Sequence, residues 1–414
     1  MRQPPIATAN PAEPKPDAAA LPEASKPTGT AFGSVALLLQ GGGALGAYQA
    51  GVYEALQEAG IEPTWIAGIS IGAVNSAIIA GNPPQTRVEK LRAFWELASE
   101  PGDFGLTAAW TDLLSGGALR RVANQVFAGQ VMVNGVAGFF TPRAPPPFLM
   151  PPGAPQATSW YDTSALRPTL ERLVDFDRIN SGQIRFSVGA VNVRTGNFAY
   201  FDNSTEVIRP EHIMASGALP PAFDAVEVDG EFYWDGGLVS NTPLDWVLSA
   251  RSDLDTLIFQ VDLWSARGEL PRDLSEVMVR IKEVQFSSRT RAATDAFRKL
   301  QHVRGLFNEL LAKMPPELAA TPQARALAMA SDPAVYNIVQ LIYRSPPYEG
   351  QSKDFEFSRR TMEEHWKAGL RDARATLAHP KVLTPPTGPH SVQVFDFTTP
   401  GRNPDGSPAQ KDPA

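Results

Sequence analysis

Residues 35–46 read VALLLQGGGALG, and they give the first indication of how the chain folds. The apolar run Val35–Leu39 predicts a short buried strand, and Gly41–Gly46 is a glycine-rich loop after it. Small and apolar residues at helical spacing then predict a helix from Ala47 to Ala59, which the next glycine ends. The segment therefore predicts the first half of a βαβ unit.

A similar pattern follows downstream. Trp65–Ala67 predicts a second short strand, Gly68-Ile69-Ser70-Ile71-Gly72 a sharp turn, and Ala73–Ala80 a helix of small residues. Both loops then lie at the carboxyl ends of neighbouring strands, where open α/β sheets bind their ligands. We therefore expect the functional site between the glycine loop and Ser70.

Two kinds of site fit these loops. The glycines match G-x-G-x-x-G, a dinucleotide fingerprint that also requires an acidic residue about 20 positions on, at the end of the second strand. Glu62 precedes that strand and Ser70 occupies its end, so the second requirement is not met. The alternative is a nucleophile elbow, G-x-S-x-G, in which Gly68 and Gly72 allow the tight turn that exposes Ser70.

The elbow interpretation gives the glycine loop a chemical role as an oxyanion hole. Backbone N–H groups of Gly42, Gly43 and Ala44, at the start of a helix, would face the negative oxygen of a tetrahedral intermediate. The two loops together would then supply a nucleophile and a stabiliser of charge.

A serine nucleophile also requires a base. An α/β-hydrolase triad places Asp and then His after the serine, but none of the histidines sits in a glycine-flanked turn at a predicted strand end; they are His212, His302, His365, His379 and His390. Asp235 does occupy such a turn, because Asp235-Gly236-Gly237 follows an apolar strand and precedes a helix. Alone, an Asp-Gly pair usually marks only a turn.

The composition excludes several classes of protein. The chain has 414 residues, a formal net charge of −7 and no cysteine. This excludes a disulfide framework, a thiolate metal site and a cysteine nucleophile, and it argues against a general nucleic-acid binder. No apolar run approaches the roughly 18 residues of a membrane span, and the N-terminus lacks the apolar core of a secretory signal. We therefore expect a cytoplasmic protein.

The sequence pattern divides the chain into four parts. Residues 1–31 are rich in Pro and Ala and are expected to be disordered. Residues 34–262 are expected to form the catalytic domain, whose sheet ends with a strand at Asp255–Val261. Residues 265–380 carry mainly helical signals, and residues 385–414 return to the composition of a mostly disordered tail.

Two segments leave alternatives open. The apolar run Val335–Tyr343 fits a strand or a buried helix. Residues 135–160 contain Phe139-Phe140, a proline-rich run around Phe148, and Trp160, and proline excludes a regular helix or a central strand there. This segment is either a long surface connection or a lid whose apolar residues cover a lipid-sized cleft.

Four motifs in this order resemble the patatin-like phospholipases: Gly41–Gly46, Gly68–Gly72, Ala215–Phe223 and Asp235–Gly237. The similarity spans about residues 34–262. It implies a three-layer α/β/α fold with a mostly helical C-terminal extension, and a dyad in which Ser70 is the nucleophile and Asp235 the base. It further implies an oxyanion hole of Gly41, Gly42, Gly43, Ala44 and Gly46, with the turn glycines Gly68, Gly72, Gly236 and Gly237. One departure is Leu45, where many members carry Arg or Lys.

The resemblance implies hydrolysis of fatty-acyl or related esters through an acyl-enzyme, in lipid catabolism, with no metal and no cofactor. The expected partner is an acyl lipid or ester and not a nucleic acid. Peripheral contact with a lipid surface is also expected, and the oligomeric state is left open. A carboxylate base is also expected to work below the imidazole pKa near 6.5. The alternative is a lipid-binding or scaffold protein that keeps the fold without turnover.

Overall fold

The computed structural model describes residues 29–100, 117–250, 254–287, 290–346, 348–387 and 391–398. The two tails that were expected to be disordered therefore fall largely outside the described residues. The remaining chain is built around one central sheet.

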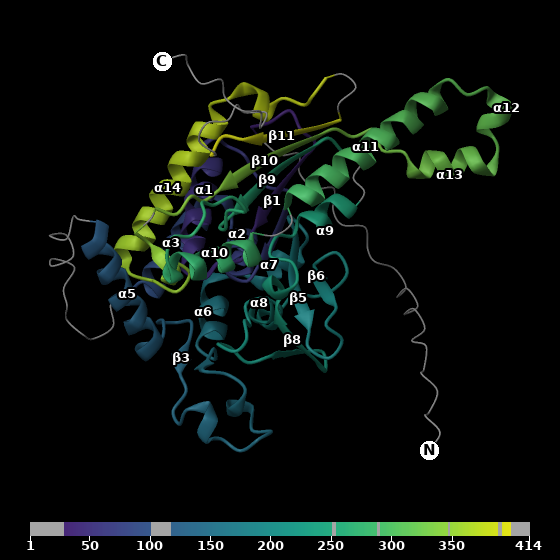
Figure 1. The fold of residues 1–414 in the computed structure, drawn as a ribbon. Helices are drawn as coiled ribbons and strands as arrows, with labels where there is room; N and C mark the ends of the chain where they lie inside the picture. Colours follow the sequence, from purple (N-terminus) through teal and green to yellow (C-terminus); the bar gives the residue numbers. More distant parts are fainter. Residues whose placement is uncertain are drawn as a thin grey trace, which may run out of the picture.

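A mixed sheet of nine strands lies at the centre of the molecule (Figure 1). Its order is β11-β10-β9-β1-β2-β5-β8-β7, with β6 paired to β5 off this path. Neighbours from β11 to β5 pair in parallel, whereas β5 pairs antiparallel with β6 and β8, and β8 with β7. The strands are β1 (Ser34–Leu39), β2 (Trp65–Ile69), β5 (Arg185–Asn192), β6 (Phe198–Asp202), β7 (Val226–Val228), β8 (Glu231–Asp235), β9 (Thr256–Asp262), β10 (Tyr336–Ile342) and β11 (Val392–Asp396). A separate pair is formed by β3 (Thr141–Pro142) and β4 (Tyr161–Asp162).

Helices cover both faces of the sheet, which gives a three-layer α/β/α fold. Along β1, Val35, Leu37 and Leu39 belong to one apolar core, and Ala36 and Leu38 belong to another on the opposite face. The first core includes residues of α1, α2, α3 and α14, and the second includes residues of α9 and α11. The helices are α1 (Ala47–Glu58), α2 (Ile71–Ala80), α3 (Arg87–Ala98), α5 (Gly117–Asn134), α6 (Leu166–Leu173), α7 (Phe176–Asn180), α8 (Pro210–Ser216), α9 (Leu244–Ser249), α10 (Leu274–Phe286), α11 (Thr290–Ala312), α12 (Pro316–Ala319), α13 (Pro322–Ala330) and α14 (Arg359–Leu377).

The far edge of the sheet differs from the sequence prediction. The strand that ends near Val261, β9, is not the last strand, because β10 pairs with it and β11 pairs with β10. The ambiguous run Val335–Tyr343 contains β10, and its continuous apolar character is typical of a parallel strand buried on both faces. The region after residue 265 is mostly helical, as expected, but its two strands continue the same sheet.

Helix α14 packs along α1, the helix that follows the glycine loop (Figure 1). A Cβ atom at Gly51 of α1 would lie 2.0 Å from the carbonyl oxygen of Trp366 in α14. A Cβ atom at Gly369 of α14 would lie 2.0 Å from the carbonyl oxygen of Tyr48 in α1. Only glycine allows both approaches, so this glycine seam joins the C-terminal region closely to the first helix.

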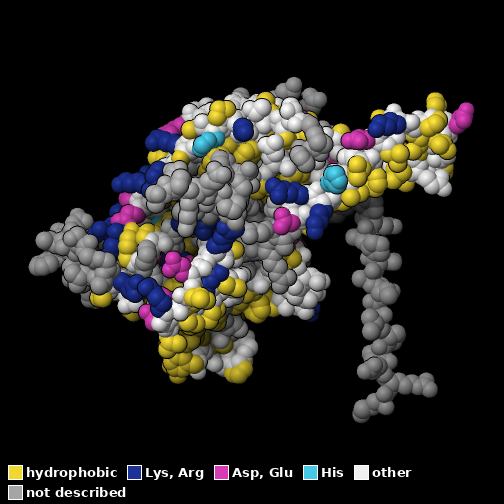
Figure 2. All heavy atoms as spheres, turned by 45° about the horizontal axis from the view of Figure 1, so that its top comes forward, with side chains coloured by type: hydrophobic (Ala, Val, Ile, Leu, Met, Phe, Trp, Pro, Cys, Tyr) yellow, Lys and Arg dark blue, Asp and Glu magenta, His cyan; other side chains and the backbone are white. Residues whose placement is uncertain are grey.

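Helices α11, α12 and α13 project from the body at the upper right of Figure 1. Apolar side chains are exposed along this arm, among them Leu306, Leu310 and Met329, and Figure 2 shows hydrophobic atoms gathered on it. Within the described part of the chain, no helix has the length and apolar character that crossing a membrane would require.

Candidate active site

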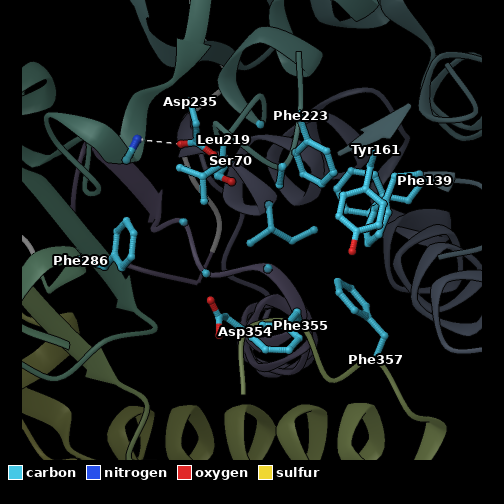
Figure 3. A pocket seen from close by; sticks show the side chains of 18 of the residues that line it. Ser70, Phe139, Tyr161, Leu219, Phe223, Asp235, Phe286, Asp354, Phe355 and Phe357 are labelled. Atoms are coloured by element: carbon cyan, nitrogen blue, oxygen red, sulfur yellow. Dashed lines mark hydrogen bonds between the residues drawn. The ribbon is translucent and has the colours of Figure 1, made fainter. Parts of the chain in front are cut away.

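Ser70 lies in the turn between β2 and α2, in a strained backbone conformation. Its φ angle is 55°, which non-glycine residues seldom adopt outside functional sites. The turn around it is tight, since a Cβ atom at Gly68 would lie 2.3 Å from the Gly72 carbonyl oxygen. A Cβ atom at Gly72 would lie 2.1 Å from the Leu39 carbonyl oxygen. The glycines therefore permit the turn, and Ser70 lines a cavity (Figure 3).

Asp235 ends β8 and lies next to Ser70 at the same cavity (Figure 3). The residue is 2% exposed, and its Oδ1 accepts a hydrogen bond from the Gly237 amide at 2.7 Å. Burial raises the pKa of this carboxyl from 3.8 to about 7, and hydrogen bonds from Ser70 and Gly237 oppose the rise. This raised pKa lies in the range of histidine and argues against the expectation that such a base would work below the imidazole pKa near 6.5.

Ser216, the last residue of α8, links the elbow to the sheet. Its hydroxyl oxygen accepts the Ser70 amide at 3.0 Å and donates to the Gly189 carbonyl of β5 at 2.7 Å. Close by, the Asp235 amide donates to the Ala218 carbonyl at 3.0 Å. Sequence reasoning identified this segment as a motif but missed its role, which is to hold the backbone of both candidate residues.

The glycine loop lies beside Ser70, and Gly41, Gly42 and Gly43 line the cavity. The amide of Gly41 donates to the Asn241 carbonyl at 3.3 Å, and the Gly41 carbonyl accepts from the side chains of Asn241 and Trp264 at 3.0 Å each. Among the described residues, no group accepts a hydrogen bond from the amides of Gly42 or Gly43. These two amides are therefore the donors available to a negative oxygen.

Two residues of the expected oxyanion hole, Ala44 and Gly46, do not line the cavity. The Ala44 amide donates to the carbonyl of Asp354 at 2.8 Å, so it is already occupied. Gly46 lies at the end of a short 3₁₀ helix, Gly43–Gly46, packed against Ile71 and Trp95, and it does not line the cavity. Sequence reasoning could not identify these partners, because they come from other parts of the chain.

Leu45 lies outside the wall of the cavity. The residue is completely buried and belongs to the apolar core that α1 shares with α14. It does not line the cavity. Leu45 is therefore a residue of the apolar core and not of the cavity wall.

The cavity has a volume of about 280 Å³ and mainly apolar walls. Val131 and Met132 of α5 form one part of the wall. Aromatic rings gather at one end, and neighbouring centroids there lie 5.0–6.5 Å apart; these rings belong to Phe139, Phe140, Tyr161, Phe223 and Phe357. Such a cavity suits a mainly apolar ligand beside Ser70.

Residues 135–160, the segment with two interpretations, contribute unequally to this wall. Phe139 and Phe140 are buried and line the cavity, whereas Phe148 is 72% and Trp160 49% exposed. The segment therefore combines a fixed wall with an exposed apolar portion, and its role as a lid stays a prediction.

No histidine among the described residues lines the cavity. His365 lies behind the glycine loop, with its Nδ1 3.3 Å from the Ala44 carbonyl oxygen, and His390 is outside the described residues. One described group has ligand atoms close enough for a metal ion, within 4.8 Å of one another, and consists of Glu206, His212 and Asp229. None of its members lines the cavity.

The family comparisons agree with the resemblance that the sequence motifs indicate. A family model described as patatin-like phospholipase matches residues 37–248, just over half of the chain. A second model, described as patatin phospholipase, matches residues 284–388, which include β10 and α14. No curated protein matches the chain.

Three solved structures share a distant likeness with the chain. VipD from Legionella pneumophila has 15% identity and a TM-score of 0.35, over 83% of this chain and 66% of VipD. Human GIVD cytosolic phospholipase A2 has 14% identity and a TM-score of 0.33, over 84% and 60%. The ExoU–SpcU complex of the Pseudomonas aeruginosa type III secretion system has 18% identity and a TM-score of 0.28, over 72% and 68%. At these scores the likenesses support no inference about activity.

Proposed function

The chain belongs to the patatin-like phospholipase family, and on this basis we propose that it is a serine acyl hydrolase that cleaves fatty-acyl esters through a Ser70–Asp235 dyad. The observation that carries the proposal is a strained serine beside a buried carboxyl at one apolar cavity. The substrate would be an acyl lipid, met through peripheral contact with a lipid surface. No group other than the protein's own residues is required for this chemistry.

In the first half-reaction, ionised Asp235 accepts the proton of the Ser70 hydroxyl as its oxygen attacks the ester carbonyl. The negative oxygen that forms is stabilised by the amides of Gly42 and Gly43, which are free to donate. When the tetrahedral intermediate collapses, Asp235 gives its proton to the leaving alcohol. The acyl group then remains on Ser70.

The second half-reaction repeats these steps with water. Asp235, ionised again, accepts a proton from a water molecule that attacks the acyl-enzyme. The same two amides hold the second oxyanion, and collapse releases the fatty acid and returns the proton to Ser70. The apolar walls would hold the acyl chain throughout, because its transfer out of water is favourable.

A fluorophosphonate probe tests the nucleophile directly, because it reacts covalently with activated serines. We expect labelling of the full chain that disappears in Ser70→Ala and falls strongly in Asp235→Asn. Ser249→Ala, which changes an exposed serine at the end of α9, is the matched control and should label normally.

Absence of labelling in native, folded protein would reject the hydrolase proposal. The alternative, a lipid-binding or scaffold protein, would then be tested with a fluorescent fatty acid. Binding without turnover, weakened by a change in the aromatic wall such as Phe223→Ala, would favour that alternative.

A further inference from the structure

A segment that is distant in sequence contacts the glycine loop, and its Asp354 lines the same cavity as Ser70. Asp354 lies in the connection between β10 and α14, and its carbonyl accepts the Ala44 amide at 2.8 Å. A Cβ atom at Gly43, where φ is 55°, would lie 2.1 Å from the same carbonyl oxygen. Only glycine permits this approach, so the two segments fit each other closely.

Two ion pairs hold this connection against α10. Lys282 Nζ lies 2.7 and 2.9 Å from the two carboxylate oxygens of Asp354. Lys353 Nζ lies 2.9 Å from Oε1 of Glu283. Two consecutive residues of α10, a lysine and a glutamate, therefore pair with two consecutive residues of the connection, an aspartate and a lysine. Lys353 is only 3% exposed, and such a partly buried arrangement is more restrictive than an exposed ion pair. The position of the Asp354 carbonyl is therefore fixed relative to α10.

A further contact comes from α14. His365 is completely buried, its Nδ1 lies 3.3 Å from the Ala44 carbonyl oxygen, and its Nε2 lies 3.1 Å from Oε1 of Glu349. Both backbone groups of Ala44 thus have partners from the region after residue 265. This region contacts the loop at the residue that follows the two free amides.

The contacts matter because a glycine-rich loop has little conformational preference of its own. In a trans peptide the Ala44 N–H and the Gly43 carbonyl point in opposite directions. Holding the Ala44 N–H toward Asp354 therefore directs the Gly43 carbonyl away from it. This restrains the peptide plane that follows Gly43, and so limits the directions that the Gly43 amide can take.

We propose that Asp354 is a positioning residue that orients the oxyanion donors Gly42 and Gly43, and that Lys282 anchors it. The inference rests on the proposed function, because it gives the C-terminal region a part in the same reaction. Asp354 acts through its backbone carbonyl, which no side-chain change removes. The test therefore releases the anchor at Lys282.

Three variants of the full chain make the test. Lys282→Met removes the ion pair to Asp354, and Lys282→Arg keeps a cation in its place. Arg272→Met is the matched control, because Arg272 is 81% exposed and pairs with Glu276 at the start of the same helix. Each variant is measured for kcat and KM on a soluble p-nitrophenyl ester, for its unfolding midpoint, and for hydrogen exchange of the Ala44 amide.

We expect Lys282→Met to lower kcat by about 10- to 100-fold, while KM changes by less than about twofold. This loss of kcat is less than, or comparable to, the loss caused by removing one oxyanion donor. Exchange at Ala44 should accelerate in this variant. Lys282→Arg should recover most of kcat, and Arg272→Met should match the wild type in kcat and in exchange.

Unchanged kcat and unchanged Ala44 exchange in folded Lys282→Met would overturn the inference. So would a lower unfolding midpoint with unchanged kcat, which would mean a purely structural ion pair. Failure of the proposed function gives a different result, in which the wild type neither hydrolyses the ester nor reacts with a fluorophosphonate. Ala44 exchange would then decide the inference alone: acceleration in Lys282→Met supports control of the loop, and equal exchange refutes it.

Discussion

The hydroxyl oxygen of Ser216 accepts the backbone amide of Ser70 at 3.0 Å, so a buried side chain of α8 supports the strained turn that presents the candidate nucleophile. Strained backbone persists only where surrounding contacts over-determine it. The elbow therefore depends on Ser216 as well as on its own glycines.

Ser216→Ala should lower both stability and activity. It leaves the Ser70 amide and the Gly189 carbonyl without this partner, and a buried polar group left unsatisfied costs about 1–3 kcal/mol. Urea denaturation should show that loss in the free energy of unfolding, and kcat should fall because the elbow relaxes. Ser249→Ala is the exposed control, and equal stability of the two variants would contradict the expectation.

The pH dependence of kcat/KM should report the ionisation of Asp235. Because burial raises its pKa to about 7, activity should rise with pH through that value and level off above it. Below it, protonated Asp235 cannot accept the Ser70 proton. If one His→Ala change in a folded variant removes this acid limb, the base is a histidine and the dyad is wrong.

Asp235→Asn should stabilise the folded protein at alkaline pH while abolishing hydrolysis. The folded-state pKa of Asp235 is raised, so its contribution to stability is present below about pH 4 and is lost as pH rises through about 7. The neutral amide avoids this loss, which amounts to at most about 4 kcal/mol.

Unfolding midpoints of the wild type and Asp235→Asn at about pH 8 and pH 4 measure this effect. The gain should be present at the higher pH and absent at the lower one. The control is Asp245→Asn, which changes an exposed carboxyl on α9. A gain of the same size at both pH values would rule out ionisation as its cause.

Phe357 should limit the length of the acyl chain. Its ring lines the cavity, 6.5 Å from that of Phe139 and 6.4 Å from that of Trp95. Phe357→Ala should raise kcat/KM for long p-nitrophenyl esters severalfold relative to short ones. Because the change costs about 3–5 kcal/mol, Phe357→Leu is a milder second variant. Phe148→Ala, at a 72% exposed ring, is the control, and an unchanged chain-length profile in both Phe357 variants would contradict the expectation.

Limited proteolysis should test whether residues 135–160 close over the cavity. If the segment is a lid, cutting near exposed Phe148 should slow when a non-hydrolysable lipid analogue is added, because the bound acyl chain orders the segment. The reference is cutting at the projecting α12, which should not change. Equal rates with and without the analogue would favour a simple surface connection.

The sequence was most informative where the chemistry is local. Ser70 and its flanking glycines occupy five consecutive residues, and the turn at Asp235 occupies three, so residue types alone indicated both loops. The βαβ unit that carries the first loop was predicted for the same reason. That the structure brings Ser70 and Asp235 to one cavity agrees with the order of the motifs.

Other parts could not be predicted, because they depend on contacts between distant segments. No pattern indicates that Asp354 meets Ala44, or that Lys282 meets Asp354. β10 was ambiguous because a short apolar run fits a buried strand and a buried helix equally well.

The glycine seam between α1 and α14 has a practical consequence for the expression of truncated forms of the protein. A fragment that stops at residue 262 keeps every motif of the proposed chemistry, yet it leaves β9 as a bare sheet edge and opens the groove at Gly51. Exposed apolar edge strands promote aggregation. A screen that expresses only the motif-bearing half would therefore record insolubility and mistake it for lack of activity.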